Sequence, residues 1–324
     1  MPLPHRREII ADAVPPPAPS PGPASAEQTG RRPLSRRQAL FLLGLAAASL
    51  STGCSWRQNS GLAALPDDYQ VKLDQLIVRS DSKLGKNDPV LRDLEEVRQR
   101  VTETLNLPKP TRPVVVYLFR DQQRYASFMQ SRHPTLPPRR AFFIGTSTEL
   151  AVYAFSGEKT SEDLRHEYTH GLLHASLKTV PLWLDEGLAE YFESPANTPG
   201  HLNSEHVGRL TAALGNGWKP DLPRLEKLED VNEMQRADYQ EAWAWVHFLL
   251  HGSDGGRQIL LTYLQDLEGA SHAPSLTRRV RNDMPEPEFR LVAYLQATLP
   301  TDRTTTARRG ESVSELNSDL LHLN

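Results

Sequence analysis

The segment from His166 to His170 contains residue types that can hold a metal ion and activate a water beside it. On an α-helix, residues four apart lie on the same face about one turn apart, so His166 and His170 can direct both imidazoles at one ion. Zinc binds neutral imidazole nitrogen, and a catalytic zinc site commonly keeps three protein ligands so that water can take the fourth position. Glu167 would project beside the ion, where a general base for that water is needed.

The third ligand could be another histidine or a carboxylate. His174 continues the four-residue spacing, but it lies roughly 12 Å along the helix axis from His166, and one ion with bonds of about 2.0–2.1 Å cannot reach both. The metzincin pattern is also excluded, because Leu173 and Ser176 stand where that pattern has its glycine and its third histidine. Glu186 is the remaining candidate.

Glu186 belongs to a second predicted helix, which begins after Pro181. A turn between the two helices would bring its carboxylate back to the ion. Glu190, one turn further on, could hydrogen-bond a ligand histidine or lie on the solvated surface of the helix, and the sequence leaves both roles open. The apolar residues of this helix recur at helical spacing, namely Leu184, Leu188, Ala189 and Phe192.

A second pair of histidines, His247 and His251, repeats the four-residue spacing without a following glutamate. The pair lies in a run of large apolar residues. Histidines in such a run are expected to pack in the core rather than to bind metal. The run consists of Trp243, Trp245, Val246, Phe248, Leu249 and Leu250.

The stretch 165–193 combines His-Glu-x-x-His with Trp-Leu-x-Glu-Gly-x-Ala. It resembles the gluzincin group of metallopeptidases, in particular the bacterial peptidase MA-like proteins, and more distantly the thermolysin and aminopeptidase N classes. The match extends more loosely over residues 69–267. The resemblance implies one zinc ion held by His166, His170 and Glu186, with Glu167 as the base that deprotonates the water.

The resemblance also matches Tyr239 to a tyrosine that hydrogen-bonds the tetrahedral oxyanion in several gluzincins, although a tyrosine packed on the core is an equal interpretation. The chain departs from the aminopeptidase N class in two ways. Its connection from His170 to Glu186 is shorter, and no Gly-x-Met-Glu-Asn segment lies upstream to anchor a free amino terminus. Glu149 does not stand where the glutamate of that anchoring segment would be expected. An endopeptidase is therefore favoured over an exopeptidase.

The remaining pattern predicts an α+β, zincin-like fold: a small mixed sheet with an active-site helix, followed by a helical subdomain. Strand 149–155 is expected at the edge of the sheet, where a substrate peptide could pair with it. Strands are predicted at 75–78, 113–119, 141–144 and 149–155, and helices at 88–105, 121–130, 204–214, 240–251, 257–267 and 287–299.

The amino-terminal sequence is typical of an export signal. Arg36 and Arg37 resemble a twin-arginine signal, and the apolar run 39–50 is too short to form a stable membrane span. Cys54, the only cysteine, resembles a lipoprotein cleavage site, with simple signal cleavage or an uncleaved anchor as alternatives. Each alternative predicts a cell-envelope protein outside the cytoplasm, and the first predicts a lipid anchor on Cys54. No intramolecular disulfide is expected.

These patterns divide the chain into a disordered amino terminus with an export signal peptide, a linker, a zincin-like metallopeptidase domain and a disordered tail. The domain would contain a part with the sheet and the metal helices and a helical part. The predicted bounds are 1–53, 54–66, 67–300 (divided into 67–193 and 194–300) and 301–324.

The formal net charge of the 324-residue chain is only −3, with basic and acidic residues interspersed, so nucleic acid is excluded as an expected partner. The expected partners are a peptide or protein substrate and the membrane, through lipid on Cys54. The predicted function is a zinc-dependent peptidase, with Glu167 as the general base. The alternative is a catalytically inactive zincin-like lipoprotein that binds cell-envelope proteins.

Overall fold

A computed structural model describes residues 64–198, 201–252 and 254–299. The predicted signal peptide, Cys54 and the predicted tail lie outside the described residues. In chain order, the described elements are β1 (Tyr69–Leu73), β2 (Leu76–Ser80), α1 (Pro89–Leu105), β3 (Val114–Phe119), α2 (Gln122–Arg132), β4 (Ala141–Gly145), β5 (Leu150–Phe155), α3 (Thr160–Ser176), α4 (Leu182–Glu193), α5 (Ser204–Gly215), α6 (Leu222–Leu225), a 3-10 turn (Val231–Glu233), α7 (Arg236–His251), α8 (Asp254–Gly269), α9 (Leu276–Asp283) and α10 (Pro287–Thr298).

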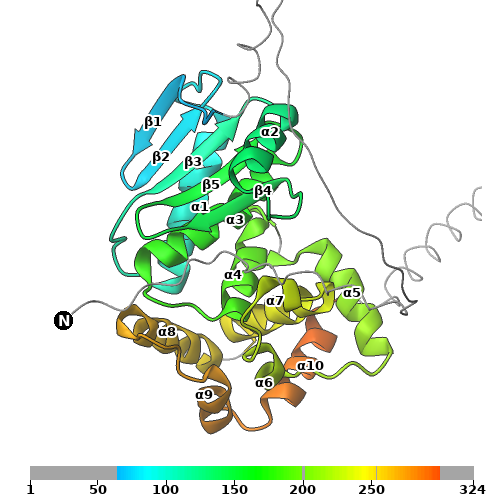
Figure 1. The fold of residues 1–324 in the computed structure, drawn as a ribbon. Coiled ribbons are helices and arrows are strands. Elements are labelled where there is room, and N and C mark those ends of the chain that lie inside the picture. The colour runs from blue at the N-terminus through cyan, green and yellow to red at the C-terminus, as the bar shows by residue number, and fades with distance from the viewer. Residues whose placement is uncertain (1–63, 199–200, 253, 300–324) are drawn as a thin grey trace, which may run out of the picture.

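The predicted α+β fold is confirmed: a five-stranded mixed sheet is followed by helices. Figure 1 shows the sheet at one end of the molecule, with α4 and α7 below it and α8, α9 and α10 further away. The strand order is β1-β2-β3-β5-β4. β2, β3 and β5 are parallel, and β1 and β4 run antiparallel to their neighbours. Among the described residues, no helix is both long and apolar enough to cross a bilayer.

Strand β3 explains how the sheet is covered on both faces. Successive strand residues point to opposite faces. Val114 and Val116 join the large core that also contains α1, α3 and α4. Val115, Tyr117 and Phe119 join a second core, under α2. Because all of β3 is buried, its sequence is a continuous apolar run rather than an alternating one.

The expectation that 149–155 forms the edge of the sheet is wrong. β5 pairs with β3 on one side and with β4 on the other, so β4 is the edge. Both strands are short apolar runs, and periodicity could not rank them. β5 is buried except for its last residue, whereas three of the five residues of β4 are only partly buried. β1, α6 and α9 were not predicted.

Helix α3 begins directly after β5 and returns across the sheet. The Thr160 hydroxyl at its start donates to the Phe155 carbonyl oxygen (3.0 Å) and accepts from the Gly157 N–H (2.6 Å). Further along, Gly171 lies so close to β3 that a Cβ atom there would stand 2.7 Å from a methyl carbon of Val114. The glycine therefore allows α3 to pack closely on the sheet.

Helix α4 crosses α7 equally closely, at the residue after Glu186. A Cβ atom on Gly187 would lie 2.7 Å from the carbonyl oxygen of Ala242. That contact is with backbone, so it can be relieved only by moving a helix. The close crossing fixes the depth at which the Glu186 carboxylate is placed.

We expect Gly187→Ala to lower the free energy of unfolding by about 1–3 kcal/mol, because the added methyl overpacks the helix crossing. Gly208→Ala is the matched control. It also lies within a helix, but a Cβ atom there has no neighbour within 4 Å, so it should raise stability by up to about 1 kcal/mol. Urea unfolding monitored by circular dichroism measures both changes. Equal effects of the two substitutions would contradict the close crossing.

Candidate metal centre

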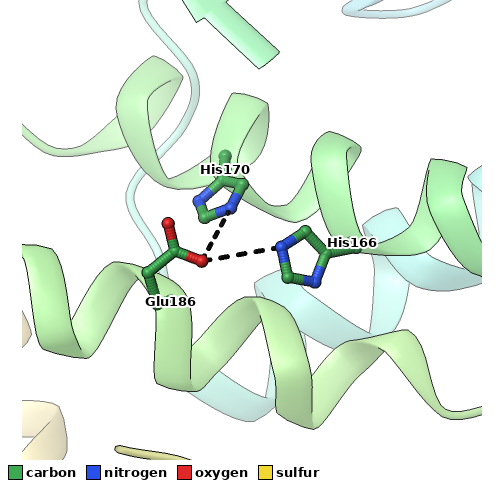
Figure 2. A group of neighbouring side chains, drawn as sticks. All are labelled: His166, His170 and Glu186. Carbon is green, nitrogen blue, oxygen red and sulfur yellow. Dashed lines mark ion pairs between the residues drawn. The ribbon is translucent and has the colours of Figure 1, made fainter. Parts of the chain in front are cut away.

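Three side chains from α3 and α4 point toward one another (Figure 2). His166 Nε2 lies 3.6 Å from Glu186 Oε2, and His170 Nε2 lies 3.8 Å from the same oxygen. The donor atoms of the three residues all lie within 4.8 Å of one another. The helix–turn–helix return predicted from the sequence thus places the carboxylate opposite both imidazoles.

These donors fit zinc. Tetrahedral zinc with bonds of about 2.0–2.1 Å needs neighbouring donor atoms about 3.3 Å apart, and the observed separations of 3.6 and 3.8 Å are close to that. Two imidazole nitrogens and one carboxylate oxygen are a ligand set of catalytic zinc sites, which leaves one position for water. His170 and Glu186 are buried and His166 is partly exposed, so the site can be reached from one side.

The opposite ring nitrogens of both histidines face carboxylates. Asp185 Oδ1 lies 2.9 Å from His170 Nδ1 as an ion pair, and its other oxygen lies 2.9 Å from His174 Nε2. Glu193 Oε2 lies 3.2 Å from His166 Nδ1. Carboxylates in these positions fix the tautomer that leaves Nε2 free for a metal and make the imidazoles more basic.

Glu190 was expected either to hydrogen-bond a ligand histidine or to lie on the solvated surface of the helix. Its ion pair is instead with a third histidine, His206 on α5, whose Nε2 lies 2.9 Å from Glu190 Oε2. Together with His166 and Glu193 it forms a second group of possible ligand atoms within 4.8 Å. In that group Glu190 is already paired with His206, which is not a member of the group. The residues of the first triad are therefore the better candidate for the ion.

Two arginines hold the end of α4 that carries Glu193. Buried Arg165 donates from Nε to the Glu193 carbonyl oxygen and pairs with Asp93 on α1 at 2.8 Å. Arg100, also on α1, donates to the carbonyl oxygen of Ser194 at 2.9 Å. Since the last carbonyls of a helix have no partner within it, these contacts fix the position from which the Glu193 carboxylate reaches His166.

Glu167 is tied to the sheet edge. Its Oε2 accepts a hydrogen bond from the backbone N–H of Phe143 on β4, at 2.6 Å. The Phe143 ring stacks on His170 and His174. Burial, together with the charge of Glu186, raises the pKa of Glu167 above its ordinary value, although His166, His170 and the Phe143 N–H oppose this. A carboxylate with a raised pKa is suited to taking up a proton near neutral pH.

The acidic surroundings of the triad favour a positive charge. Burial alone would lower the pKa of His166, but its contacts with Glu186 and Glu193 raise it well above the ordinary value. Burial also works against His170, and the charges of Asp185 and Glu186 raise its pKa to about 9. Without a metal ion, these carboxylates stabilise imidazolium. A divalent cation would satisfy the same charges.

We expect zinc affinity to rise steeply with pH, because the ion must displace protons from His166 and His170. Each displaced proton changes the dissociation constant about 10-fold per pH unit. In the metal-free protein the raised pKa values add stability that is complete below about pH 6.5. That stability is lost as pH rises through the folded-state pKa, about 9 for His170. Competition titrations at pH 6, 7 and 8, with melting of the metal-free protein from pH 6 to 9.5, test this. An affinity independent of pH would contradict it.

Asp185→Asn should weaken zinc binding by about 10- to 100-fold, because an orienting carboxylate is lost while all three ligands remain. His170 and His174 hold the pKa of Asp185 well below its usual range, against its burial, so the charged carboxylate is the native form. Chelator competition gives the affinity, and Asp163→Asn on α3 is the control. A loss no larger than in this control would show that Asp185 does not orient His170.

Tyr239 lies at the start of α7, near the triad. Burial and the charge of Glu186 raise its pKa to about 12, while Arg139 and His166 act in the opposite direction. Its hydroxyl is thus protonated at neutral pH. The charges of two members of the triad, Glu186 and His166, therefore act on Tyr239.

A cavity of about 270 Å³ opens onto the centre. It lies between β4, the segment 132–139, α3 and the first turn of α4, and it extends to Val231 and Asn232. Its wall includes His166, Glu167 and Glu186.

Sequence reasoning gave no role to Asp185, Glu193 or Arg139. Asp185 and Glu193 could have been found as carboxylates on the helix of Glu186, but which of them faces a histidine depends on how α4 packs on α3.

The second pair of histidines hydrogen-bonds tyrosines. His247 Nδ1 lies 2.8 Å from the Tyr294 hydroxyl, and His251 Nε2 lies 2.8 Å from the Tyr191 hydroxyl. His247 is buried, as expected of a histidine packed in the core, whereas His251 is exposed, so the expectation is wrong for His251.

Residues 162–269 match the model of a family described as "Protein of unknown function (DUF1570)". The chain matches no curated protein. Among solved structures, it is similar to the crystal structure of a two domain M1 zinc metallopeptidase mutant bound to L-arginine, with a TM-score of 0.39 and 16% sequence identity. The match covers 72% of this chain and 52% of that one, so this chain spans about half the length of the solved structure.

Proposed function

We propose that the chain is a zinc-dependent endopeptidase of the gluzincin group. One observation carries this: two imidazole Nε2 atoms lie 3.6 and 3.8 Å from one Glu186 oxygen, beside a further carboxylate and an open cavity. The further carboxylate is that of Glu167, which is not one of the three converging residues. This is the division of labour that metal-assisted hydrolysis needs.

His166, His170 and Glu186 would hold the ion. Bound zinc would supply a Lewis acid that polarises the scissile carbonyl and lowers the pKa of a water toward about 7. Glu167 receives the water's proton and later delivers it to the leaving amine. The hydrogen bond from the Phe143 N–H aims the carboxylate, and burial raises its pKa. Both features suit a group that must accept and then release a proton.

Tyr239 is proposed to donate a hydrogen bond to the oxyanion that develops on the scissile carbonyl. Its raised pKa keeps the hydroxyl protonated, and removal of one such donor commonly costs about 2.7–4 kcal/mol of transition-state stabilisation. The substrate backbone is proposed to lie along β4. That strand is the edge of the sheet on the cavity side, so it has backbone groups without a sheet partner.

We further propose that residues 67–300 act as an exported domain held at the membrane by lipid on Cys54. The paired arginines and the short apolar run support export, and the lone cysteine that follows supports lipidation. Mass spectrometry of membrane-extracted protein would detect an acylated Cys54 as the first residue. A mature chain that begins elsewhere would contradict this part of the proposal.

The experiment is to measure bound zinc and hydrolysis of casein and of a peptide library by the purified protein. We expect one zinc per chain, internal cleavage of peptides, loss of activity with a chelator and recovery with zinc. Stoichiometric zinc without hydrolysis would favour an inactive zincin-like binding protein. If the protein purified without chelators contained no zinc, the metal site would be refuted, and α3 and α4 would have only a structural role.

A further inference from the structure

Arg139 is an exposed residue that lines the cavity at the candidate metal centre. It belongs to the segment between α2 and β4 and stands two residues before the edge strand begins at Ala141. The same cavity is lined by His166, Glu167 and Glu186. The exposed guanidinium of Arg139 is therefore open to a substrate that enters the cavity.

The charge of Arg139 is not neutralised within the described part of the chain. Its neighbour Arg140 pairs with Asp163 at 2.6 Å and Glu162 at 3.3 Å. By contrast, none of the ion pairs among the described residues involves Arg139 or Arg132, which also lines the cavity. The described contacts of Arg139 are the Phe142 ring, 5.8 Å from its Cζ, and Tyr239. A guanidinium has five N–H donors, and no ion pair within residues 64–198, 201–252 and 254–299 engages those of Arg139.

Among the described residues, none of the carboxylates that line the cavity forms an ion pair with Arg139, and each has another contact. Glu167 accepts from the Phe143 N–H, Asp185 pairs with two histidines, and Glu186 faces both ligand imidazoles. The cavity wall is thus acidic at the metal centre and basic at the segment 132–139. Its apolar part is formed by Leu136, Phe142, Ile144, Leu182 and Val231.

We propose that Arg139 is a specificity-determining residue that binds a carboxylate of the substrate, with Arg132 adding positive charge. A planar guanidinium pairs with a carboxylate through two parallel hydrogen bonds, which gives both strength and orientation. The substrate class is then peptides with a carboxylate close to the scissile bond, either on an Asp or Glu side chain or at the carboxyl terminus. This inference rests on the proposed peptidase function.

The test compares kcat/KM for matched fluorogenic peptides. One pair differs by Glu against Gln next to the cleaved bond, and a second pair has a free or an amidated carboxyl terminus there. We expect the wild type to prefer one acidic member by about 10-fold or more. Arg139→Gln should lose this preference while it keeps cleaving the neutral peptides, and Arg139→Lys should retain part of it. The peptide pair for which the acidic member is preferred shows whether Arg139 binds a side-chain carboxylate or a terminal carboxylate.

Arg140→Gln is the matched control. It removes the same charge from the neighbouring residue, whose side chain already pairs with Asp163 and Glu162. It should keep the wild-type preference. Wild-type cleavage of neutral and acidic peptides at equal rates would overturn the inference while leaving the peptidase proposal intact. An equal fall in kcat for every peptide in Arg139→Gln would also overturn it, since that would place Arg139 on the oxyanion. No cleavage of any peptide would refute the peptidase proposal itself. In that case, equal binding of acidic and amide peptides, measured by fluorescence anisotropy, would overturn carboxylate recognition separately.

Discussion

Glu167→Gln is expected to reduce peptide hydrolysis by about 100- to 10,000-fold, the usual contribution of a general base, while the protein keeps one zinc per chain. Glutamine retains an oxygen that can accept the Phe143 N–H bond, which Glu167 accepts at 2.6 Å. The position of the side chain is therefore preserved, and only its ability to take up a proton is lost. Zinc content by mass spectrometry and kcat for a fluorogenic peptide measure the two properties separately.

Glu162→Gln is the matched control for that change. It removes a carboxylate from the same helix, where Glu162 pairs with Lys159 and Arg140 at partly exposed positions. Exposed pairs contribute little to stability, so activity and zinc content should both stay near wild type. If Glu167→Gln kept full activity with full zinc, another group would have to be the base.

Glu186→Gln is expected to weaken zinc binding by at least about 100-fold, more than the loss of an orienting residue causes, and to abolish hydrolysis with it. The carboxylate oxygen lies 3.6 and 3.8 Å from the two imidazole nitrogens. Its replacement by a neutral amide removes both a ligand charge and the attraction that holds the centre together. Chelator competition gives the affinity, and circular dichroism checks that the helices remain.

The control for Glu186→Gln is Glu205→Gln on α5, whose carboxylate pairs with Arg209 at the surface. It should leave zinc affinity unchanged. Undiminished zinc affinity in Glu186→Gln would reject the proposed triad and turn attention to the second group, which contains Glu190 and Glu193. The two glutamate variants thus separate a base, whose loss spares the metal, from a ligand, whose loss removes it.

Local sequence predicted most of the elements, because helices and buried strands impose periodicities of 3.6 and 2 on their apolar residues. The helix predicted at 88–105 is observed as Pro89–Leu105, and the one predicted at 287–299 as Pro287–Thr298. β1 was missed because its residues are mostly exposed and lack an apolar pattern. α9 was missed because basic residues dominate it.

The order of strands could not be predicted in the same way. Strands β4 and β5 have similar apolar composition, and only pairing with β3 decides which of them is internal. The correction moves the predicted substrate-binding edge from β5 to β4. It thereby places that edge beside Glu167, through the hydrogen bond from Phe143.

The sequence by itself determined the ligand candidates, since a four-residue spacing on a helix dictates that His166 and His170 share a face, whatever surrounds them. Tertiary packing decided everything that depends on which side chains meet across elements. It placed Glu193 rather than Glu190 on His166, set Asp185 between two histidines, and left the charge of Arg139 facing the cavity. Helical periodicity fixes the face on which a residue lies, but the neighbour that it meets there depends on long-range contacts, which local spacing does not encode.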